Sequence, residues 1–213
     1  VHGKASLIGR MPGKEWDRFA NLRLLYALMF AHPGGQLLFM GGEIGQTSEW
    51  NFKTELDWHL LQYDFHKGIQ RYVKELNRLF TTLPALYELQ YSPTGFEWIA
   101  GDDVANSVIT FLRKGKTGTP DLLVVLHFTP VHREGYQIGV EKEQEWEVVL
   151  NSDAEQWGGK NKGPQLGERL RPREISWHGK PHSLAVDLPP LGGVWLVQKS
   201  SVVGSADPAD SSE

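Results

Sequence analysis

The fold class is decided by Leu37-Leu38-Phe39-Met40-Gly41-Gly42-Glu43, an apolar run that ends in two glycines and a carboxylate. Four consecutive apolar side chains indicate a strand with both faces covered, as in the centre of a parallel sheet. The helix predicted before it, residues 15–32, ends at Pro33-Gly34-Gly35. A parallel strand needs parallel neighbours joined by crossovers of a dozen or more residues, and the sequence offers no second strand of this kind. We therefore expect the last part of a larger α/β enzyme.

The bulk composition favours a soluble protein from the cytoplasm. The chain has 213 residues, 40% of them hydrophobic, and a formal charge of -4 with lysine and arginine scattered along it, which argues against nucleic-acid binding. No apolar stretch reaches the roughly 18 residues of a membrane span. The absence of cysteine excludes disulfides and thiolate chemistry. Because Val1-His2-Gly3-Lys4 has neither an initiator methionine nor a signal-peptide pattern, we expect further polypeptide upstream.

The first part of the chain, residues 1–91, is predicted to be helical with one strand. A helix over about residues 14–31 is apolar on nearly every side, so we expect it to be buried on more than one face. A second helix over about residues 68–80 carries a single apolar stripe. Residues 43–65 lie between the strand and this helix as a long irregular segment, and loops of that length in compact domains are usually functional or disordered. The aromatic residues in this segment argue against disorder.

The second part, residues 92–199, is predicted to be an antiparallel β-sandwich. Short strand candidates alternate there with clusters of glycine, proline, aspartate and asparagine. Residues 151–181 are predicted to form a long loop, and residues 200–213 a disordered tail. The strand candidates are residues 96–99, 107–112, 122–128, 136–138, 146–150, 183–188 and 194–197.

Motifs for cofactor or metal chemistry are missing from the sequence. There is no glycine-rich phosphate loop, no G-x-G-x-x-G motif and no G-x-S-x-G nucleophile elbow. His178 and His182 have a spacing that two metal ligands could use, but no third ligand is clustered with them. The alternative is that they belong to a loop and the strand after it. We therefore expect no metal and no cofactor.

Glu43 is the carboxylate with the most informative position. It follows the end of the predicted strand, where barrel enzymes place functional residues, and glycosyl transfer uses pairs of carboxylates held a few ångströms apart. A single carboxylate without a partner strand does not make such a pair. Glu43 is therefore predicted to line a substrate site, the alternative being a loop carboxylate that caps backbone N–H groups.

Trp50-Asn51 is a second candidate for sugar binding. Aromatic rings stack on sugar faces, and an asparagine side chain can pair with two hydroxyl groups through its donor and its acceptor. The alternative is that Trp50 covers a hydrophobic core.

Several segments together resemble the C-terminal region of the 1,4-α-glucan (glycogen) branching enzymes, which belong to the α-amylase superfamily. They occur in the same order and with similar gaps from residue 1 to about residue 199. The segments are Val1-His2-Gly3-Lys4, Arg10-Met11-Pro12-Gly13, residues 16–23, Leu37 to Glu43, Glu49-Trp50-Asn51, residues 56–61, Gly95-Phe96-Glu97-Trp98, Phe128-Thr129-Pro130-Val131, Leu150-Asn151-Ser152-Asp153 and His182-Ser183-Leu184.

The resemblance implies the last part of a (β/α)8 barrel followed by an all-β domain. Enzymes of this family cleave an α-1,4 linkage, hold the glucan as a covalent intermediate and transfer it to a 6-hydroxyl, which makes an α-1,6 branch. Their catalytic carboxylates would lie upstream of Val1, so no catalytic residue is assigned to this chain and it is expected to be inactive alone. The resemblance places His2 and Lys4 beside the substrate site, and Glu43, Trp50 and Asn51 along it. The expected partners are an α-glucan and the missing N-terminal barrel.

Two functional hypotheses follow from the sequence. The first is a branching-enzyme fragment without its catalytic residues. The second is a non-catalytic β-sandwich module that binds glucan. Burial of each large apolar side chain of the helix over residues 14–31 stabilises the fold by roughly 1.5–3 kcal/mol. Without the rest of a barrel, several of these side chains would stay uncovered. We therefore expect the helical part not to fold well alone.

Overall fold

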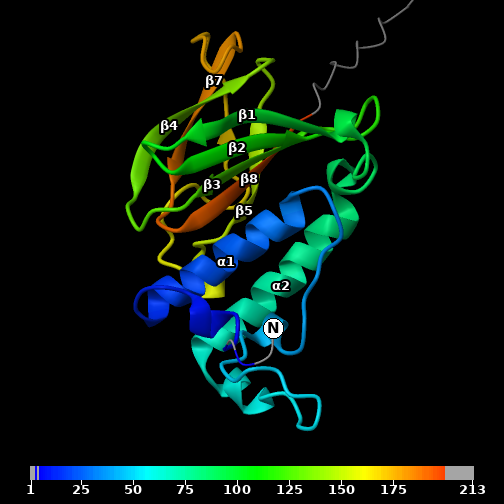
Figure 1. Ribbon diagram of the computed structural model, residues 1–213. Helices are drawn as coiled ribbons and strands as arrows, with labels where there is room; N and C mark the ends of the chain where they lie inside the picture. The colour runs from blue at the N-terminus through cyan, green and yellow to red at the C-terminus, as the bar shows by residue number, and fades with distance from the viewer. Residues whose placement is uncertain (1–2, 4, 200–213) are drawn as a thin grey trace, which may run out of the picture.

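The computed structural model describes Gly3 and residues 5–199. The predictions for His2, Lys4 and the tail at 200–213 lie outside these residues. Helix α1 lies against one face of a β-sheet, and helix α2 lies beside α1 (Figure 1). The helices are α1 (Glu15–Ala31) and α2 (Asp64–Thr82), and the strands are β1 (Phe96–Asp103), β2 (Val108–Arg113), β3 (Leu122–His127), β4 (Arg133–Val140), β5 (Trp146–Asn151), β6 (Arg169–Leu170), β7 (His182–Leu188) and β8 (Gly192–Gln198). Short 3-10 turns connect them, among them η1 (Ile8–Arg10), η2 (Gly42–Ile44) and η3 (Trp58–Gln62).

The strands form two antiparallel sheets. The larger sheet has the order β1-β2-β3-β8-β5-β6, and the smaller one pairs β4 with β7. Alternate side chains of a strand point to opposite faces, so β3 contributes Leu123 and Val125 to one core and Val124 and Leu126 to another. The first core also contains Ile138 and other side chains of the small sheet. The β part is therefore an antiparallel sandwich, and the all-β prediction is confirmed.

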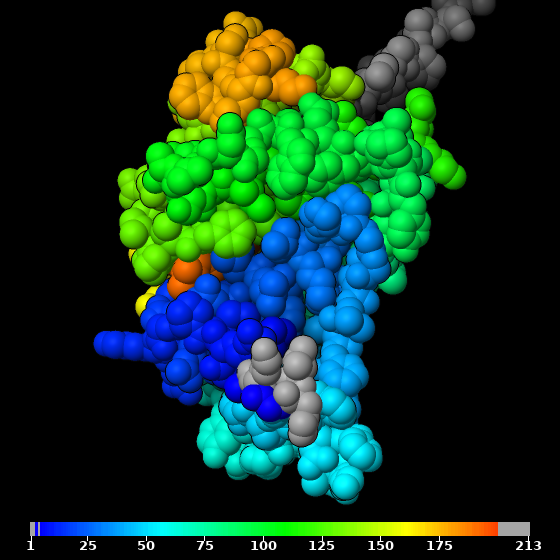
Figure 2. All heavy atoms as spheres, viewed as in Figure 1, coloured from blue at the N-terminus to red at the C-terminus, as the bar shows by residue number. Residues whose placement is uncertain are grey.

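The second core lies between the large sheet and the helices. It joins Leu22 and Phe30 of α1 with Leu76 of α2 and with Phe111 and Trp195 of the sheet. On the face drawn in Figure 2, atoms of α1 and atoms of β1 and β2 adjoin one another. α1 is thus buried on more than one side, as its all-round apolar sequence predicts.

Two buried arginines also connect the helices to the β part. The guanidinium of Arg113 donates to the carbonyl oxygens of Ala31 (2.5 Å) and Leu86 (3.0 Å), and burial lowers the pKa of Arg113 to about 10. Arg23 of α1 donates to Ser152 O (2.6 Å) and lies 3.8 Å from the carboxylate of Asp153. Charged groups are buried in this way when they are hydrogen-bonded. The apolar core and these contacts cross residue 91, where a domain boundary is predicted; that boundary stays a prediction.

The strand predicted at residues 37–40 is wrong for this structure. The segment forms no strand, and Leu37 and Phe39 are 75% and 56% exposed. Leu38, between them, packs on the helical core. The sequence pattern is that of a strand covered on both sides, but a strand also needs neighbours for its backbone N–H and C=O groups. Among the described residues no parallel strand is present to supply them, so no part of a (β/α)8 sheet forms here.

The other predicted elements are confirmed with small shifts in their bounds. Both helices form, and α2 begins at Asp64 and ends at Thr82, longer at each end than predicted. Each of the seven strand candidates overlaps an observed strand, and residues 107 and 128 fall just outside β2 and β3. The two-residue strand β6 lies inside the segment predicted as a loop, where Leu170 pairs with Trp146.

Candidate functional site

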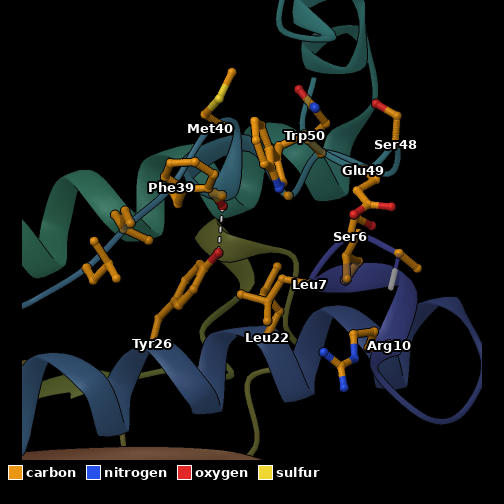
Figure 3. Close-up of a pocket in the computed structure, with 17 residues that line it drawn as sticks. Ser6, Leu7, Arg10, Leu22, Tyr26, Phe39, Met40, Ser48, Glu49 and Trp50 are labelled. Atoms are coloured by element: carbon orange, nitrogen blue, oxygen red, sulfur yellow. Dashed lines mark hydrogen bonds between the residues drawn. The ribbon is translucent and has the colours of Figure 1, made fainter. Parts of the chain in front are cut away.

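A cavity of about 260 Å³ lies between the start of the chain, helix α1 and residues 37–50 (Figure 3). Ser6 and Arg10 line it from the region of η1, and Leu22 and Tyr26 line it from α1. The segment at 37–50 closes the other side. Three stretches of the first 50 residues thus meet at one site.

The turn at residues 40–46 holds the far wall of this cavity in place. Its backbone is left-handed at Met40, Gly41 and Gly45, a conformation that glycine adopts without strain. The hydroxyl of Tyr26 donates to Gly42 O at 2.7 Å, the dashed line in Figure 3. On the other side of η2, the Nδ1 atom of His66 lies 2.8 Å from the carbonyl oxygen of Ile44. The turn is therefore fixed to both helices.

Tyr26 is a fixed hydrogen-bond donor here and not an acid or base. Burial raises the pKa of its hydroxyl well above the ordinary value, and the nearby carboxylate of Glu43 raises this pKa further. The hydroxyl therefore stays protonated at neutral pH. A permanent donor suits the task of holding Gly42 in the cavity wall.

Aromatic side chains lie at the mouth of the cavity. The rings of Phe39 and Trp50 meet edge to face with their centroids 5.4 Å apart, and the ring of Phe52 lies 6.4 Å from that of Trp50. Phe52 is 74% exposed and Trp50 is half-buried. Glu49 and Ser48 line the cavity beside Trp50 (Figure 3). Partly exposed rings next to hydrogen-bonding groups are typical of surfaces that bind sugars or other ligands with apolar faces.

The structure separates the site residues predicted from sequence. Trp50 lines the cavity, whereas Glu43 is half-buried in η2 and is not among the lining residues. Asn51 lies in an exposed turn, where its side-chain oxygen accepts a hydrogen bond from Lys53 N at 3.0 Å. His2 and Lys4 lie outside the described residues. Of the five predicted residues, the structure thus places one in the cavity wall.

Sequence reasoning missed Ser6, Arg10 and Tyr26 as members of the site. Arg10 belongs to one of the segments that carry the family resemblance, and that was the available signal. Ser6 is fixed through its hydroxyl, which donates to Thr47 O at 2.8 Å and so ties the start of the chain to the segment before Trp50. Tyr26 is indistinguishable in sequence from the other large residues of its helix.

The cavity is equipped for binding more than for bond cleavage. It is lined by one carboxylate, that of Glu49, and one guanidinium, that of Arg10, whereas glycosyl transfer requires a pair of carboxylates.

Among Gly3 and residues 5–199 there is no group of three or more residues suited to hold a metal ion. His178, whose spacing from His182 two metal ligands could use, instead accepts a hydrogen bond through Nδ1 from Gly139 N at 3.3 Å. Over the same residues, none of the helices has the length and apolar character to cross a membrane.

Comparison with known proteins identifies the type of domain. Residues 98–199 match the family model of the alpha amylase C-terminal all-beta domain. Over 92% of its length, the chain is 51% identical to the 1,4-alpha-glucan branching enzyme GlgB of Aquifex aeolicus, and it covers 31% of that protein. It is 55% identical over 90% of its length to the GlgB of Pseudomonas putida and covers 26% of it. The chain thus spans less than a third of the length of these relatives.

Solved structures show the same fold at low sequence identity. The Thermus thermophilus protein Ttha1563 covers 92% of this chain with 19% identity and a TM-score of 0.60, and the match takes up 34% of that protein. An Anoxybacillus alpha-amylase covers 87% of this chain with 15% identity and a TM-score of 0.51, over 34% of its own length. The family resemblance drawn from the sequence motifs is confirmed. Residues 98–199 match the alpha-amylase C-terminal all-beta domain, within a chain that is similar over 92% of its length to part of a 1,4-alpha-glucan branching enzyme.

Proposed function

We propose that this chain is the C-terminal portion of a 1,4-α-glucan branching enzyme. The whole enzyme transfers a segment of an α-1,4-glucan to a 6-hydroxyl by a retaining mechanism and forms the α-1,6 branches of glycogen in the cytoplasm. The observation that carries this proposal is identity of 51–55% to branching enzymes over at least 90% of the chain. Because the match covers the helical part and the β part together, it supports more than a shared β domain.

In this proposal the chain contributes substrate binding, and the catalytic carboxylates come from upstream polypeptide. Trp50 has the most direct support, since it lines the cavity and meets Phe39 edge to face. Glu43 precedes Trp50 in the same irregular segment and Asn51 directly follows it. The family resemblance adds His2 and Lys4 to the site. The proposed ligand is an α-glucan chain whose sugar faces stack on the aromatic rings.

The segment at 37–40 is where we propose that the upstream barrel joins this chain. Leu37 and Phe39 expose their side chains on one face, while Leu38 packs on the helices from the other. Side chains of the other barrel strands would cover Leu37 and Phe39, and a parallel strand beside the segment would pair with its backbone. The relatives are more than three times as long as the part of them that this chain matches, so polypeptide is available in them for this role.

Measuring new α-1,6 linkages in amylose tests the proposal. The chain of residues 1–213 is expected to make none, whereas a polypeptide extended upstream to the length of the relatives is expected to make branches that a debranching enzyme releases. In the longer protein, Trp50→Ala should raise KM for amylose. Trp177→Ala is the matched control, because Trp177 is 45% exposed and lies outside this cavity. Robust branch formation by residues 1–213 alone would overturn the assignment of the catalytic carboxylates to upstream sequence.

A glucan-binding module without catalytic function is the second candidate. It is favoured by the match of residues 98–199 on their own to a family model of an all-β domain. Co-sedimentation of residues 1–213 with glycogen distinguishes the two proposals. Retention that survives Trp50→Ala assigns binding to the β part and supports the module, whereas retention lost with Trp50→Ala supports the substrate site of a branching enzyme.

A further inference from the structure

Residues 47–56 form a largely exposed loop that carries Trp50 at the mouth of the cavity (Figure 3). The ring of Trp50 meets that of Phe39, which lies outside the loop, with 5.4 Å between the two centroids. A side chain on a loop binds a ligand best when contacts already fix the loop, because binding otherwise has to order it. The contacts at the two ends of this loop therefore bear on the position of Trp50.

Gln46 joins the two ends of the loop. Its side-chain oxygen Oε1 accepts a hydrogen bond from the backbone N–H of Asp57 at 3.0 Å. A backbone N–H group can only donate, so the atom of the Gln46 amide that faces it is the oxygen and not the nitrogen. Gln46 is 7% exposed, and its own backbone N–H donates to Gly41 O at 3.0 Å. The side chain is thus a buried connection between the turn at residues 40–46 and the far end of the loop.

Gly41 provides the space for this side chain. A Cβ atom at residue 41 would lie 2.6 Å from Oε1 and 2.8 Å from Cβ of Gln46, closer than the favourable separation of about 3.5–4.0 Å. The φ angle of Gly41 is +83°, which glycine adopts without strain. Residue 41 therefore has to be glycine for Gln46 to reach Asp57 in this way.

Two other hydrogen bonds hold the first residues of the loop. The hydroxyl of Ser6 donates to Thr47 O at 2.8 Å, and the hydroxyl of Ser48 donates to the carboxylate of Asp57. Ser48 is exposed, so water competes for its hydrogen bond, whereas Gln46 is buried. Of the two contacts that join one end of the loop to the other, the one made by Gln46 is therefore the better shielded.

We propose that Gln46 is a positioning residue for Trp50. By holding the backbone of Asp57 it keeps the loop closed at its base, and the closed loop keeps the Trp50 ring against Phe39 in the cavity wall. Gln46 needs no contact with the ligand for this role. That the ligand is an α-glucan rests on the proposed function, so the inference names the side chain that prepares the same site for binding.

Two NMR measurements on residues 1–213 test this role through the indole N–H signal of Trp50, which is the signal missing from Trp50→Ala. Gln46→Met keeps a side chain of similar length but removes the acceptor. It should weaken maltotriose binding by about three- to tenfold, the effect of one lost hydrogen bond. Without ligand, the same variant should lower the ¹H–¹⁵N heteronuclear NOE of the Trp50 indole, which reports motion on the ps–ns timescale. Gln46→Glu retains an oxygen for the N–H of Asp57 and should keep most of the affinity.

Gly41→Ala gives an independent test, because its methyl group would displace the Gln46 side chain. It should weaken maltotriose binding as Gln46→Met does. Gly118→Ala is the matched control, since Gly118 has a similar φ of +90° but its Cβ would meet no atom within 4 Å, and it does not line the cavity. Gln70→Met is the control for Gln46→Met, because Gln70 is exposed on α2 and does not line the cavity either. Both controls should leave the affinity and the Trp50 NOE unchanged.

Either of two results would overturn the proposal. One is an unchanged Trp50 NOE and unchanged maltotriose affinity in Gln46→Met. The other is a loss of affinity in Gln46→Glu as large as that in Gln46→Met, because the acceptor would then not be the cause. Should Gln46→Met fail to fold, the comparison of Gly41→Ala with Gly118→Ala decides, and equal affinities in these two variants overturn the proposal.

The Trp50→Ala chain separates this inference from the proposed function. If Trp50→Ala weakens maltotriose binding and Gln46→Met does not, the positioning role fails and the proposed function stands. If neither substitution weakens binding, the proposed glucan site beside Trp50 fails as well. In the longer polypeptide, Gln46→Met should raise KM for amylose and leave kcat unchanged, whereas a general loss of folded enzyme would lower kcat.

Discussion

Replacing Gly193 by alanine directly tests how α1 packs on the large sheet. A Cβ atom at this position of β8 would lie 2.9 Å from Cδ2 of Leu126 and 3.0 Å from Cβ of Ala27 in α1. The favourable separation of two carbon atoms is about 3.5–4.0 Å, so the new methyl group is about 0.5–1 Å too close on both sides. Neither contact atom can move freely, because Leu126 and Ala27 are both fully buried.

Overpacking of this kind costs about 1–3 kcal/mol. For a chain of this size each kcal/mol corresponds to about 2–4 °C in Tm, so Gly193→Ala should lower Tm by about 2–12 °C. Urea and thermal unfolding of residues 1–213 measure the change. Gly35→Ala is the matched control, because its Cβ would meet no atom within 4 Å and its φ is not positive.

A second substitution makes the test specific to the helix. Adding Ala27→Gly to the Gly193→Ala chain removes one of the two close contacts. The loss for the double variant should therefore be smaller than the sum of the two single losses, since residues in contact give non-additive effects. If Gly193→Ala unfolds at the same urea concentration as the unmodified chain and as Gly35→Ala, α1 does not pack on β8 as described.

Three further predictions concern single groups. Tyr26→Phe removes the hydrogen bond to Gly42 O and should lower the free energy of unfolding by about 0.5–1.5 kcal/mol in urea; an unchanged midpoint would contradict the role given to this hydroxyl. For Glu97, burial acts to raise the pKa, but hydrogen bonds from two lysines outweigh it and the pKa is lowered. The stability from this carboxylate is therefore present above the unfolded pKa of about 4.3 and is lost as pH falls through the folded value, so Glu97→Gln should flatten the acid side of a plot of urea midpoint against pH. Burial lowers the pKa of His127 in the folded chain. The unfolded chain therefore binds a proton at His127 at a higher pH than the folded chain does, and the free energy of unfolding should fall as pH drops below about 6.5. His127→Gln should make that decline shallower, and an equally steep decline would show that other groups cause it.

The β part was predictable because its strands carry their environment in their own sequences. The residues of β3, for example, read as a short apolar run between turn signals, and it lies at the centre of the large sheet. The two residues of β6 are too few to show any periodicity, so their pairing with β5 was missed. The run at 37–40 was misread for a different reason. Its four apolar side chains are typical of a strand that is covered on both faces, and the residues that would cover it are not among those described.

The candidate site was less predictable than the fold because it is assembled from three separate segments of the first 50 residues, and only their packing brings them together. Trp50 was found because an aromatic residue in a long loop stands out in sequence. Ser6 and Tyr26 have no such signal, and their place at the cavity follows from how η1 and α1 pack. Arg113 likewise reads as an ordinary surface charge, whereas its neighbours in space make it one of the most buried side chains.

The burial of Arg113 has a consequence for any attempt to divide this polypeptide. Its guanidinium is held by carbonyl oxygens on both sides of residue 91, those of Ala31 and Leu86 before it and that of Gly95 after it. Expressing the β part without the helices would remove two of these three acceptors and, with them, the residues that cover Arg113 and the apolar face of the large sheet. A recombinant fragment that begins at residue 92 should therefore expose Phe111 and Trp195 to water and be less soluble than the whole chain.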